Sequence, residues 1–206
     1  MAFDETQSTA PLSHPAGSDR KSFGLYRTLL IDMSVLTVQG QGALSMIGCL
    51  MRRSGFLAVF LHRLAAACVT KGLLGRIGAS ILMRLNIFFN GCDISPRAVI
   101  GPGFKLSHPV GVVIGPAVVG SNVMMMQGVT LGMRHFTDDE DDPANYPIIG
   151  DNVIISTGAK IIGGVKIGEH ALIGANAVVL KDVPPHSTAV GIPARLVNVK
   201  SRPQDV

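Results

Sequence analysis

A repeat of six residues is the feature of this 206-residue sequence that most narrows the folds open to it. Branched apolar residues recur at intervals of six without a gap: Ile149, Ile155, Ile161, Ile167, Ile173 and Val179. A second apolar series follows the first by four positions: Val153, Ala159, Val165, Ala171, Ala177 and Val183. A helix repeats every 3.6 residues and a strand every two, so neither gives this period. Hexapeptide units wound into a parallel β-helix do, and a mainly β fold is predicted.

Each hexapeptide unit is expected to supply one short strand and one turn, and three units to complete a triangular coil. The isoleucine series would then point inward and stack from coil to coil. The same series continues upstream through Ile94, Ile100, Leu106, Val112, Val123 and Val129. The interval of eleven between Val112 and Val123 predicts a tightened turn between Gly115 and Asn122.

A polar segment interrupts the repeat between Val129 and Ile149, which lie twenty residues apart. Residues 133–147 include two prolines and an acidic run at 138–142. We expect a loop that leaves the coil, and such loops in regular solenoids often carry function. The acidic run does not match the calcium-loop pattern, so we interpret it as a solvated loop tip and expect no metal.

The N-terminal part of the chain has a helical periodicity instead. Three- and four-residue spacing of apolar residues predicts two helices, one containing Phe56, Val59, Phe60, Arg63, Leu64 and Ala67 and the other running from Leu73 to Phe89. Gly72 and Gly75 are expected to mark the break between them. The predicted organisation is a flexible tail (1–21), a helical region (22–90), a β-helix domain (91–199) and a short C-terminal tail (200–206).

Two interpretations of the helical region stay open. The helices either pack on each other, on the β-helix or on a neighbouring subunit, or make peripheral contact with an anionic membrane through a basic, amphipathic surface. The basic residues are Arg52, Arg53, Arg63, Lys71, Arg76 and Arg84. No stretch reaches the roughly 18 uninterrupted apolar residues that a membrane-spanning helix needs, so a soluble protein is expected.

Composition excludes several other classes of protein. Hydrophobic residues make up 47% of the chain and charged residues 16%, as in a globular domain. The net charge of +4 suits an anionic ligand, but no arginine-rich stretch interleaved with aromatic residues points to nucleic acid. Cys49, Cys68 and Cys92 lack metal-ligand spacing, and an odd count without a signal-peptide pattern indicates a reducing, cytoplasmic location.

Three ordered motifs carry a resemblance to a known family. They are DISPRAVIGPGFKLSHPVGVVIG, QGVTLG and IGANAVVLKDVPPHSTAVGIPAR, within roughly residues 50–199. Together they resemble the hexapeptide acyltransferases of the serine acetyltransferase type. The resemblance implies a left-handed parallel β-helix, which departs from the usual right-handed crossover rule. It also implies a homotrimer with active sites between adjacent subunits, and acetyl-CoA as the co-substrate.

The resemblance assigns the catalytic roles to His108, as general base, and to Asp93, which orients it from fifteen residues upstream. A hydroxyl is a poor nucleophile at neutral pH, so a base must take its proton as it attacks the thioester. A carboxylate beside the base fixes the imidazole tautomer and stabilises the imidazolium that forms.

The resemblance also assigns CoA contacts in the groove between coils. The matching residues are Gly132, Thr157, Ala175, Leu180, Lys181 and Arg195. Small residues at Gly132 and Ala175 would let the pantetheine chain approach the backbone. The charges of Lys181 and Arg195 suit the phosphates of CoA.

The acceptor side departs from the family pattern. Serine acetyltransferases have an aspartate before the catalytic histidine, where this chain has Ser107, and an Arg-His pair where it has Asn145 and Tyr146. Neutral side chains thus replace the charged partners of the serine ammonium and carboxylate groups. These substitutions predict a sugar hydroxyl as acceptor, as in the O-acetyltransferases of capsule, exopolysaccharide and colanic-acid biosynthesis.

Two alternative functions stay open beside a saccharide O-acetyltransferase. One is a serine O-acetyltransferase of cysteine biosynthesis, which the family resemblance favours. The other is a non-catalytic hexapeptide scaffold, which the pair His108 and Asp93 disfavours.

Overall fold

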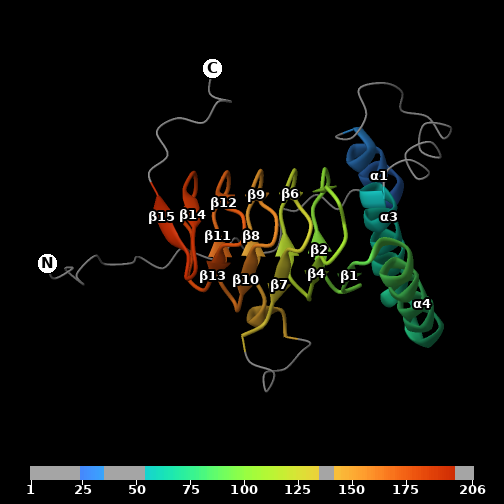
Figure 1. Cartoon of the computed structure of the whole chain (residues 1–206). Helices are drawn as coiled ribbons and strands as arrows, with labels where there is room; N and C mark the ends of the chain where they lie inside the picture. Colours follow the sequence, from blue (N-terminus) through green and yellow to red (C-terminus); the bar gives the residue numbers. More distant parts are fainter. Residues whose placement is uncertain (1–23, 35–53, 135–141, 198–206) are drawn as a thin grey trace, which may run out of the picture.

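The computed structural model of the chain describes residues 24–34, 54–134 and 142–197. The whole predicted N-terminal tail (1–21), the C-terminal tail and residues 138–141 of the acidic run lie outside these ranges. A mainly β body of stacked coils is confirmed in the C-terminal part (Figure 1). Helices α1 (Leu25–Ser34), α3 (Ser54–Val69) and α4 (Gly72–Asn90) stand at its N-terminal end.

The coils form three sheets from strands of two or three residues. The first sheet contains β1 (Asp93–Ile94), β4 (Val113–Ile114), β7 (Thr130–Gly132), β10 (Lys160–Ile162) and β13 (Val178–Val179). The second contains β2 (Val99–Ile100), β5 (Val118–Val119), β8 (Ile148–Ile149) and β11 (Lys166–Ile167). The third contains β3 (Lys105–Leu106), β6 (Met124–Met125), β9 (Ile154–Ile155), β12 (Leu172–Ile173), β14 (Thr188–Val190) and β15 (Arg195–Val197). All pairings are parallel except that of β14 with β15.

The inward residue of each strand builds the core. Ile149, Ile155, Ile161 and Ile173 are fully buried. Inward residues of paired strands stack from coil to coil, as Ile173 does on Ile155 and Ile167 on Ile149. Burying a side chain of this size contributes roughly 1.5–3 kcal/mol, so the ladder of coils is the main source of stability. Removing one step, as in Ile161→Ala, would cost about 2–5 kcal/mol because a cavity remains.

The predicted register is wrong in the second coil. Val112, Val123 and Val129 were expected to continue the isoleucine series, but they belong to the second, small-residue series and precede the strands. The inward strand residue after Leu106 is Ile114, eight positions further on. Two extra residues therefore lengthen the turn before β4. Simple counting hid them because the second series is also apolar and buried.

The predicted tightened turn between Gly115 and Asn122 is present. The step from Ile114 to the next inward residue, Val119, is five residues instead of six. Its turn closes with a short hydrogen bond, in which the Ala117 N–H donates to the Gly115 carbonyl at 2.6 Å.

Left-handed backbone conformations make the corners. At one corner φ is +55° at Asn122, +56° at Asn152, +57° at His170 and +56° at His186. Asparagine and histidine are among the residues that tolerate this conformation best after glycine. The rings of His170 and His186 stack with centroids 4.9 Å apart. Packing at a corner accounts for these two histidines.

Glycines let the helices approach the coils and each other. A Cβ on Gly55 of α3 would lie 1.9 Å from the carbonyl oxygen of Leu106 on β3. Gly75, predicted to lie in the break between the helices, instead lies inside α4, where a Cβ would meet the Cys68 carbonyl oxygen at 2.2 Å. Close backbone packing explains both glycines. The break itself falls before Gly72.

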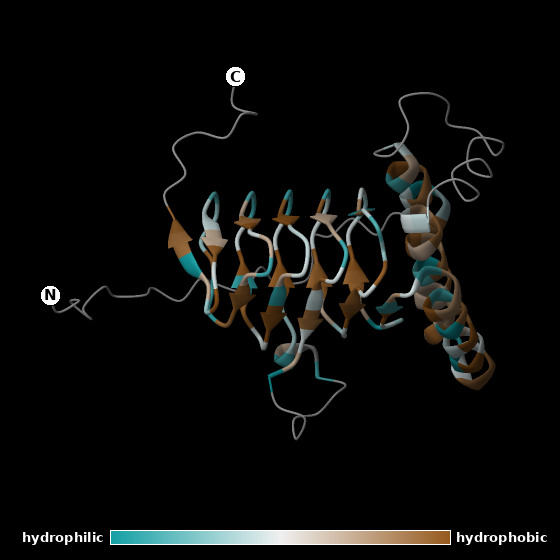
Figure 2. Cartoon of the chain, viewed as in Figure 1, coloured by the Kyte–Doolittle hydropathy of each residue, from teal (hydrophilic) through white to brown (hydrophobic). Residues whose placement is uncertain are grey.

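Helix α4 is long and apolar enough to cross a membrane by length and composition alone, and it is the one such helix in the described part of the chain. The expectation from sequence required an uninterrupted apolar run, which Arg76 and Arg84 break. Only 11% of the helix is buried, and apolar residues cover much of its outer surface (Figure 2).

Candidate active site

The lengthened turn between β3 and β4 presents His108. Its backbone has φ of +55°, and its side chain is exposed. Hydrogen bonds hold both ends of the turn, from the Ser107 N–H to the Met125 carbonyl and from the Gly111 N–H to the Gly91 carbonyl, each at 2.8 Å. Other corners of the coils show the same conformation at asparagine and histidine, so φ identifies His108 as a corner residue.

Asp93 begins the strand that lies beside this turn. Its N–H donates to the Val112 carbonyl at 2.9 Å, and β1 pairs with β4 so that Asp93 faces Val113. The Asp93 side chain is exposed, like that of His108. The two residues with predicted catalytic roles therefore lie at the same corner of adjacent coils. No hydrogen bond joins His108 to Asp93, both of which lie in the described ranges.

A buried polar network fixes the backbone next to Asp93. The Asn86 side-chain NH₂ donates to the Ala58 carbonyl at 3.1 Å. The Asn86 Oδ1 accepts from Asn90 Nδ2 at 2.8 Å and from Cys92 Sγ at 3.4 Å. Burial and the neighbouring Asp93 charge raise the pKa of Cys92 to about 12, so its thiol stays protonated. The network ties the end of α4 and the start of β1 to α3.

The predicted acceptor residues lie at two different corners. Ser107, half-buried, precedes His108 where the chain passes from the third sheet to the first. Asn145 ends the short 3₁₀-helix Pro143–Asn145, and Tyr146 follows it, where the chain passes from the first sheet to the second. A single chain therefore does not bring Ser107 and Tyr146 together.

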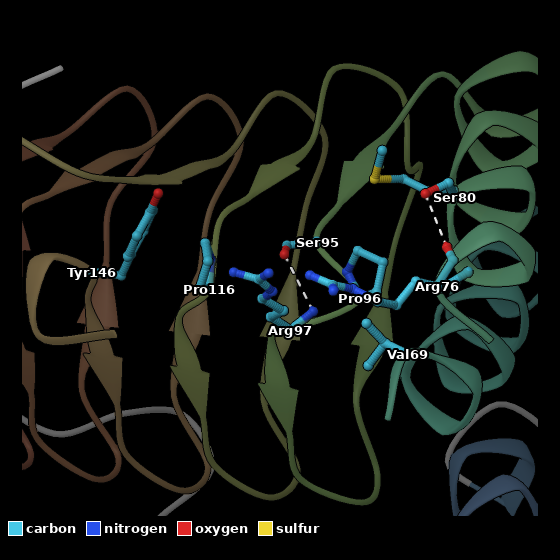
Figure 3. A pocket seen from close by; sticks show the side chains of 10 residues that line it. Val69, Arg76, Ser80, Ser95, Pro96, Arg97, Pro116 and Tyr146 are labelled. Atoms are coloured by element: carbon cyan, nitrogen blue, oxygen red, sulfur yellow. Dashed lines mark hydrogen bonds between the residues drawn. The ribbon is translucent and has the colours of Figure 1, made fainter. Parts of the chain in front are cut away.

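Tyr146 lines a cavity of about 390 Å³ between α4 and this second corner (Figure 3). Arg76 of α4 and Arg97 of the β1–β2 turn contribute guanidinium groups to the lining, and no carboxylate does. The cavity therefore suits an anionic group. Tyr146 is only 6% exposed because its ring packs against Gly115, where a Cβ would lie 2.1 Å from the ring. This packing fixes the position of the ring, and the contact of Tyr146 with an acceptor stays a prediction.

Three of the predicted CoA residues lie where strands of the first sheet end. Gly132 ends β7, and Leu180 and Lys181 follow β13, both exposed. A Cβ on Gly132 would meet Ile162 at 3.5 Å, an ordinary contact, so packing does not require glycine there. Arg134, which follows β7 by two residues, donates to the Leu180 carbonyl at 2.9 Å.

The other three lie elsewhere on the coils. Thr157 and Ala175 lie in the turns that precede β10 and β13, at the opposite ends of the strands of the first sheet. The Asn176 N–H donates to the Thr157 carbonyl there at 2.8 Å. Arg195 begins β15 in the third sheet, and its Nη1 donates to the Ala194 carbonyl at 3.0 Å. The predicted CoA residues thus lie in two groups, one at each end of the strands of the first sheet, with Arg195 apart from both. Within one chain they do not line a single groove.

Sequence reasoning missed the two cavity arginines. Arg76 was counted only among scattered basic residues, and Arg97 stands inside a motif that was read for its hexapeptide pattern. Only the packing of α4 beside the β1–β2 turn places them along one cavity. Among the residues in the described ranges, no group of three His, Cys, Asp or Glu side chains could hold a metal ion.

The coil architecture together with the comparisons below identifies the class of protein, an acyltransferase of the hexapeptide-repeat type. Residues 146–181 match the family model described as bacterial transferase hexapeptide (six repeats). A serine acetyltransferase of Bacillus pumilus is 40% identical over 173 residues, which cover 84% of this chain and 77% of the relative. The chain belongs to the serine acetyltransferase family.

Solved structures agree with this membership. Soybean serine acetyltransferase complexed with serine has 39% identity and a TM-score of 0.74, over 84% of this chain and 69% of that one. A serine acetyltransferase in complex with CoA has 32% identity and a TM-score of 0.72, over 84% and 69%. The predicted left-handed parallel β-helix and acyltransferase activity are confirmed. The predicted likeness to capsule, exopolysaccharide and colanic-acid acetyltransferases has no support from these relatives.

Proposed function

We propose that this chain is an acetyl-CoA-dependent O-acetyltransferase that acetylates the hydroxyl of L-serine, with His108 as general base. The observation that carries the proposal is the lengthened turn that presents His108 beside Asp93, in a chain 40% identical to a serine acetyltransferase. Acetyl-CoA is the acetyl donor of this family, in agreement with the predicted co-substrate. The predicted cytoplasmic location suits an enzyme that draws on acetyl-CoA.

In the proposed reaction the serine hydroxyl oxygen attacks the thioester carbonyl carbon while His108 takes the hydroxyl proton. Collapse of the tetrahedral intermediate breaks the carbon–sulfur bond, and the imidazolium returns the proton to the departing thiolate. The products are O-acetylserine and CoA. Asp93 would stabilise the imidazolium and hold the neutral ring in the tautomer that accepts a proton. Because both side chains are exposed in a single chain, we expect them to come into register when substrate binds.

The proposed CoA site uses Gly132 and Ala175 as points of close approach for the pantetheine chain. Lys181 and Arg195, both exposed, would pair with phosphates. Thr157 and Leu180 would contribute contacts along the same path. A Cβ at Gly132 would make only ordinary contacts within the chain, so packing of the fold does not require a glycine there, which supports a role in ligand approach.

A homotrimer with shared active sites is part of the proposal. Ser107 and His108 lie at one corner of the chain, and Asn145 and Tyr146 at another, with the first sheet between them. A site that uses both groups requires two copies, the corner of one chain facing the other corner of its neighbour. This separation supports the predicted assembly with active sites between adjacent subunits.

The cavity arginines favour serine over a neutral sugar. Loss of the family's Arg-His pair removes a partner for the substrate carboxylate, but Arg76 and Arg97 supply positive charge in the cavity beside Tyr146. A carboxylate prefers such a pair of guanidinium groups. A sugar hydroxyl stays the second candidate acceptor, because Ser107, Asn145 and Tyr146 carry no charge.

Acceptor identity is tested by following CoA release with L-serine and, separately, with neutral saccharides and nucleotide sugars. We expect saturable release with L-serine and a mass-spectrometric product of serine plus one acetyl group. Arg97→Gln should raise the KM for serine about tenfold or more, with the KM for acetyl-CoA unchanged. Saturable release with a saccharide and none with serine would replace the first candidate with the second.

A further inference from the structure

Helix α4 buries small and polar side chains and exposes large apolar ones, the reverse of the usual arrangement in a globular protein. Its three buried residues, Ala79, Asn86 and Asn90, are small or polar. Most of its large apolar residues are exposed instead. Six of them lie on one side of the helix: Leu73, Leu74, Ile77, Ile81, Leu85 and Phe88, with exposures of 74%, 83%, 50%, 53%, 38% and 80%. Ile87 and Phe89 are also exposed, and Leu82 and Met83 are half-buried. An apolar stripe of this width normally faces a core.

Contacts on the buried side fix this orientation. Gly75 fits against the Cys68 carbonyl only without a Cβ, and Asn86 donates to the Ala58 carbonyl of α3 at 3.1 Å. Rotating the helix to bury its leucines would break this bond and drive larger side chains into α3. The outward apolar face, defined here as residues 73, 74, 77, 81, 85 and 88, is therefore a stable feature of the fold.

The charged residues on α4 and in the segment that precedes it are all basic. The sequence contains no Asp or Glu between Asp32 and Asp93. Lys71 precedes α4 and Arg84 lies on the edge of the outward face, both exposed. In Figure 2 the ribbon of α4, at the end of the molecule away from the later coils, is largely brown, the colour of hydrophobic residues.

We propose that the outward apolar face of α4 docks on an anionic lipid bilayer, with the helix lying in the plane of the interface. An apolar stripe edged by basic residues gains both from burial among acyl chains and from attraction to anionic headgroups. Packing of α4 against α4 of a second copy would instead bring Lys71 and Arg84 toward the same positive charges. Crossing the bilayer would carry Arg76 and Arg84 into the hydrocarbon, which lying in the plane avoids. The inference is independent of the acceptor proposed above.

Vesicle co-sedimentation of the full chain tests this inference. The probes are vesicles of phosphatidylcholine alone and vesicles with about one-third phosphatidylglycerol. One variant, Leu74→Gln with Phe88→Gln, removes apolar contact, and another, Lys71→Gln with Arg84→Gln, removes charge. The control is Leu196→Gln, which changes a 54% exposed leucine on β15 at the other end of the coils. All four changed positions on and before α4 are exposed, so circular dichroism should show folded proteins.

We expect the wild type and the control to bind the anionic vesicles, and binding to weaken as salt is added. The apolar variant should lower the partition coefficient about tenfold or more, and the charge variant should abolish the preference for anionic lipid. No binding by the wild type, or equal binding to neutral vesicles, would overturn the proposal. If the wild type ignores vesicles and the apolar variant alone yields a smaller assembly by light scattering, the face is a contact between copies.

Discussion

Arg63 of α3 and Asp32 of α1 form a buried ion pair, with Nε 3.1 Å from Oδ2. The same carboxylate accepts from the N–H groups of Gly103 at 2.8 Å and Phe104 at 3.2 Å in the turn between β2 and β3. Arg63 also donates to the Gly101 carbonyl at 2.7 Å. The pair therefore fastens both helices to the first coil, one strand before the turn that carries His108.

Asp32→Asn should destabilise the fold by about 3–5 kcal/mol, because the Arg63 charge stays buried without its counter-charge. The free energy of unfolding by urea measures the loss. Asp32→Leu combined with Arg63→Met should be less destabilised than either single change, since no lone charge is then buried. A loss below about 1 kcal/mol for Asp32→Asn would show that the pair is not needed to hold α1.

Stability should fall as the solution is acidified below about pH 6.5, and His62 is the reason. Burial and the adjacent Arg63 charge lower the pKa of His62 from 6.5 to about 3. At a pH between these two pKa values, His62 is protonated in the unfolded chain and neutral in the folded chain. The fold should lose about 1.4 kcal/mol per pH unit, or about 2 kcal/mol by pH 5, before most carboxylates titrate. His62→Leu should flatten the curve in this window, and an unchanged slope would refute the assignment.

Cys92 should resist alkylation in the folded enzyme. Its side chain is buried, its thiol donates to Asn86, and burial and the Asp93 charge raise its pKa to about 12. At pH 8 iodoacetamide should modify Cys92 at least about 100-fold more slowly than in the unfolded chain. Cys68, partly exposed, is the internal control and should react in both states. Equal labelling of the two cysteines in the folded protein would contradict this.

Gly132→Ala distinguishes an effect on the proposed CoA site from an effect on the stability of the fold. A Cβ there has only ordinary contacts, so the free energy of unfolding should change by less than about 0.5 kcal/mol. The KM for acetyl-CoA should rise roughly tenfold if the pantetheine chain passes over this residue. The control is Gly78→Ala on α4, which has nothing within 4 Å and should leave the KM unchanged. An unaltered KM for Gly132→Ala would remove Gly132 from the site.

The coils were predictable from sequence because every inward position of the ladder is buried and apolar, and most of them hold a branched residue. The series from Ile149 to Val179 shows the six-residue period without a gap. The family motifs predict catalytic roles for Asp93 and His108. Register in the second coil was not predictable by counting. Val112 has the residue type of either apolar series, so only the observed pairing of Ile114 with Ile94 decides between them.

The positions of the predicted acceptor residues in the fold were also not predictable from the sequence. Tyr146 has the residue type of a sugar platform, but its ring fills the space left by Gly115, thirty-one positions earlier in the chain. Nothing local to Tyr146 signals that contact. The cavity arginines depend in the same way on how α4 packs beside the β1–β2 turn, which is a tertiary relationship.

Replacement of His108 by asparagine tests the central claim most directly. Asparagine tolerates the left-handed backbone, as Asn122 and Asn152 do at other corners, so His108→Asn should fold normally. The matched control is His186→Asn, an exposed histidine with φ of +56° at a corner distant from the turn. With L-serine and acetyl-CoA, kcat should fall at least about 100-fold for His108→Asn and stay unchanged for His186→Asn. Equal kcat values for His108→Asn and the wild type would contradict His108 as the general base.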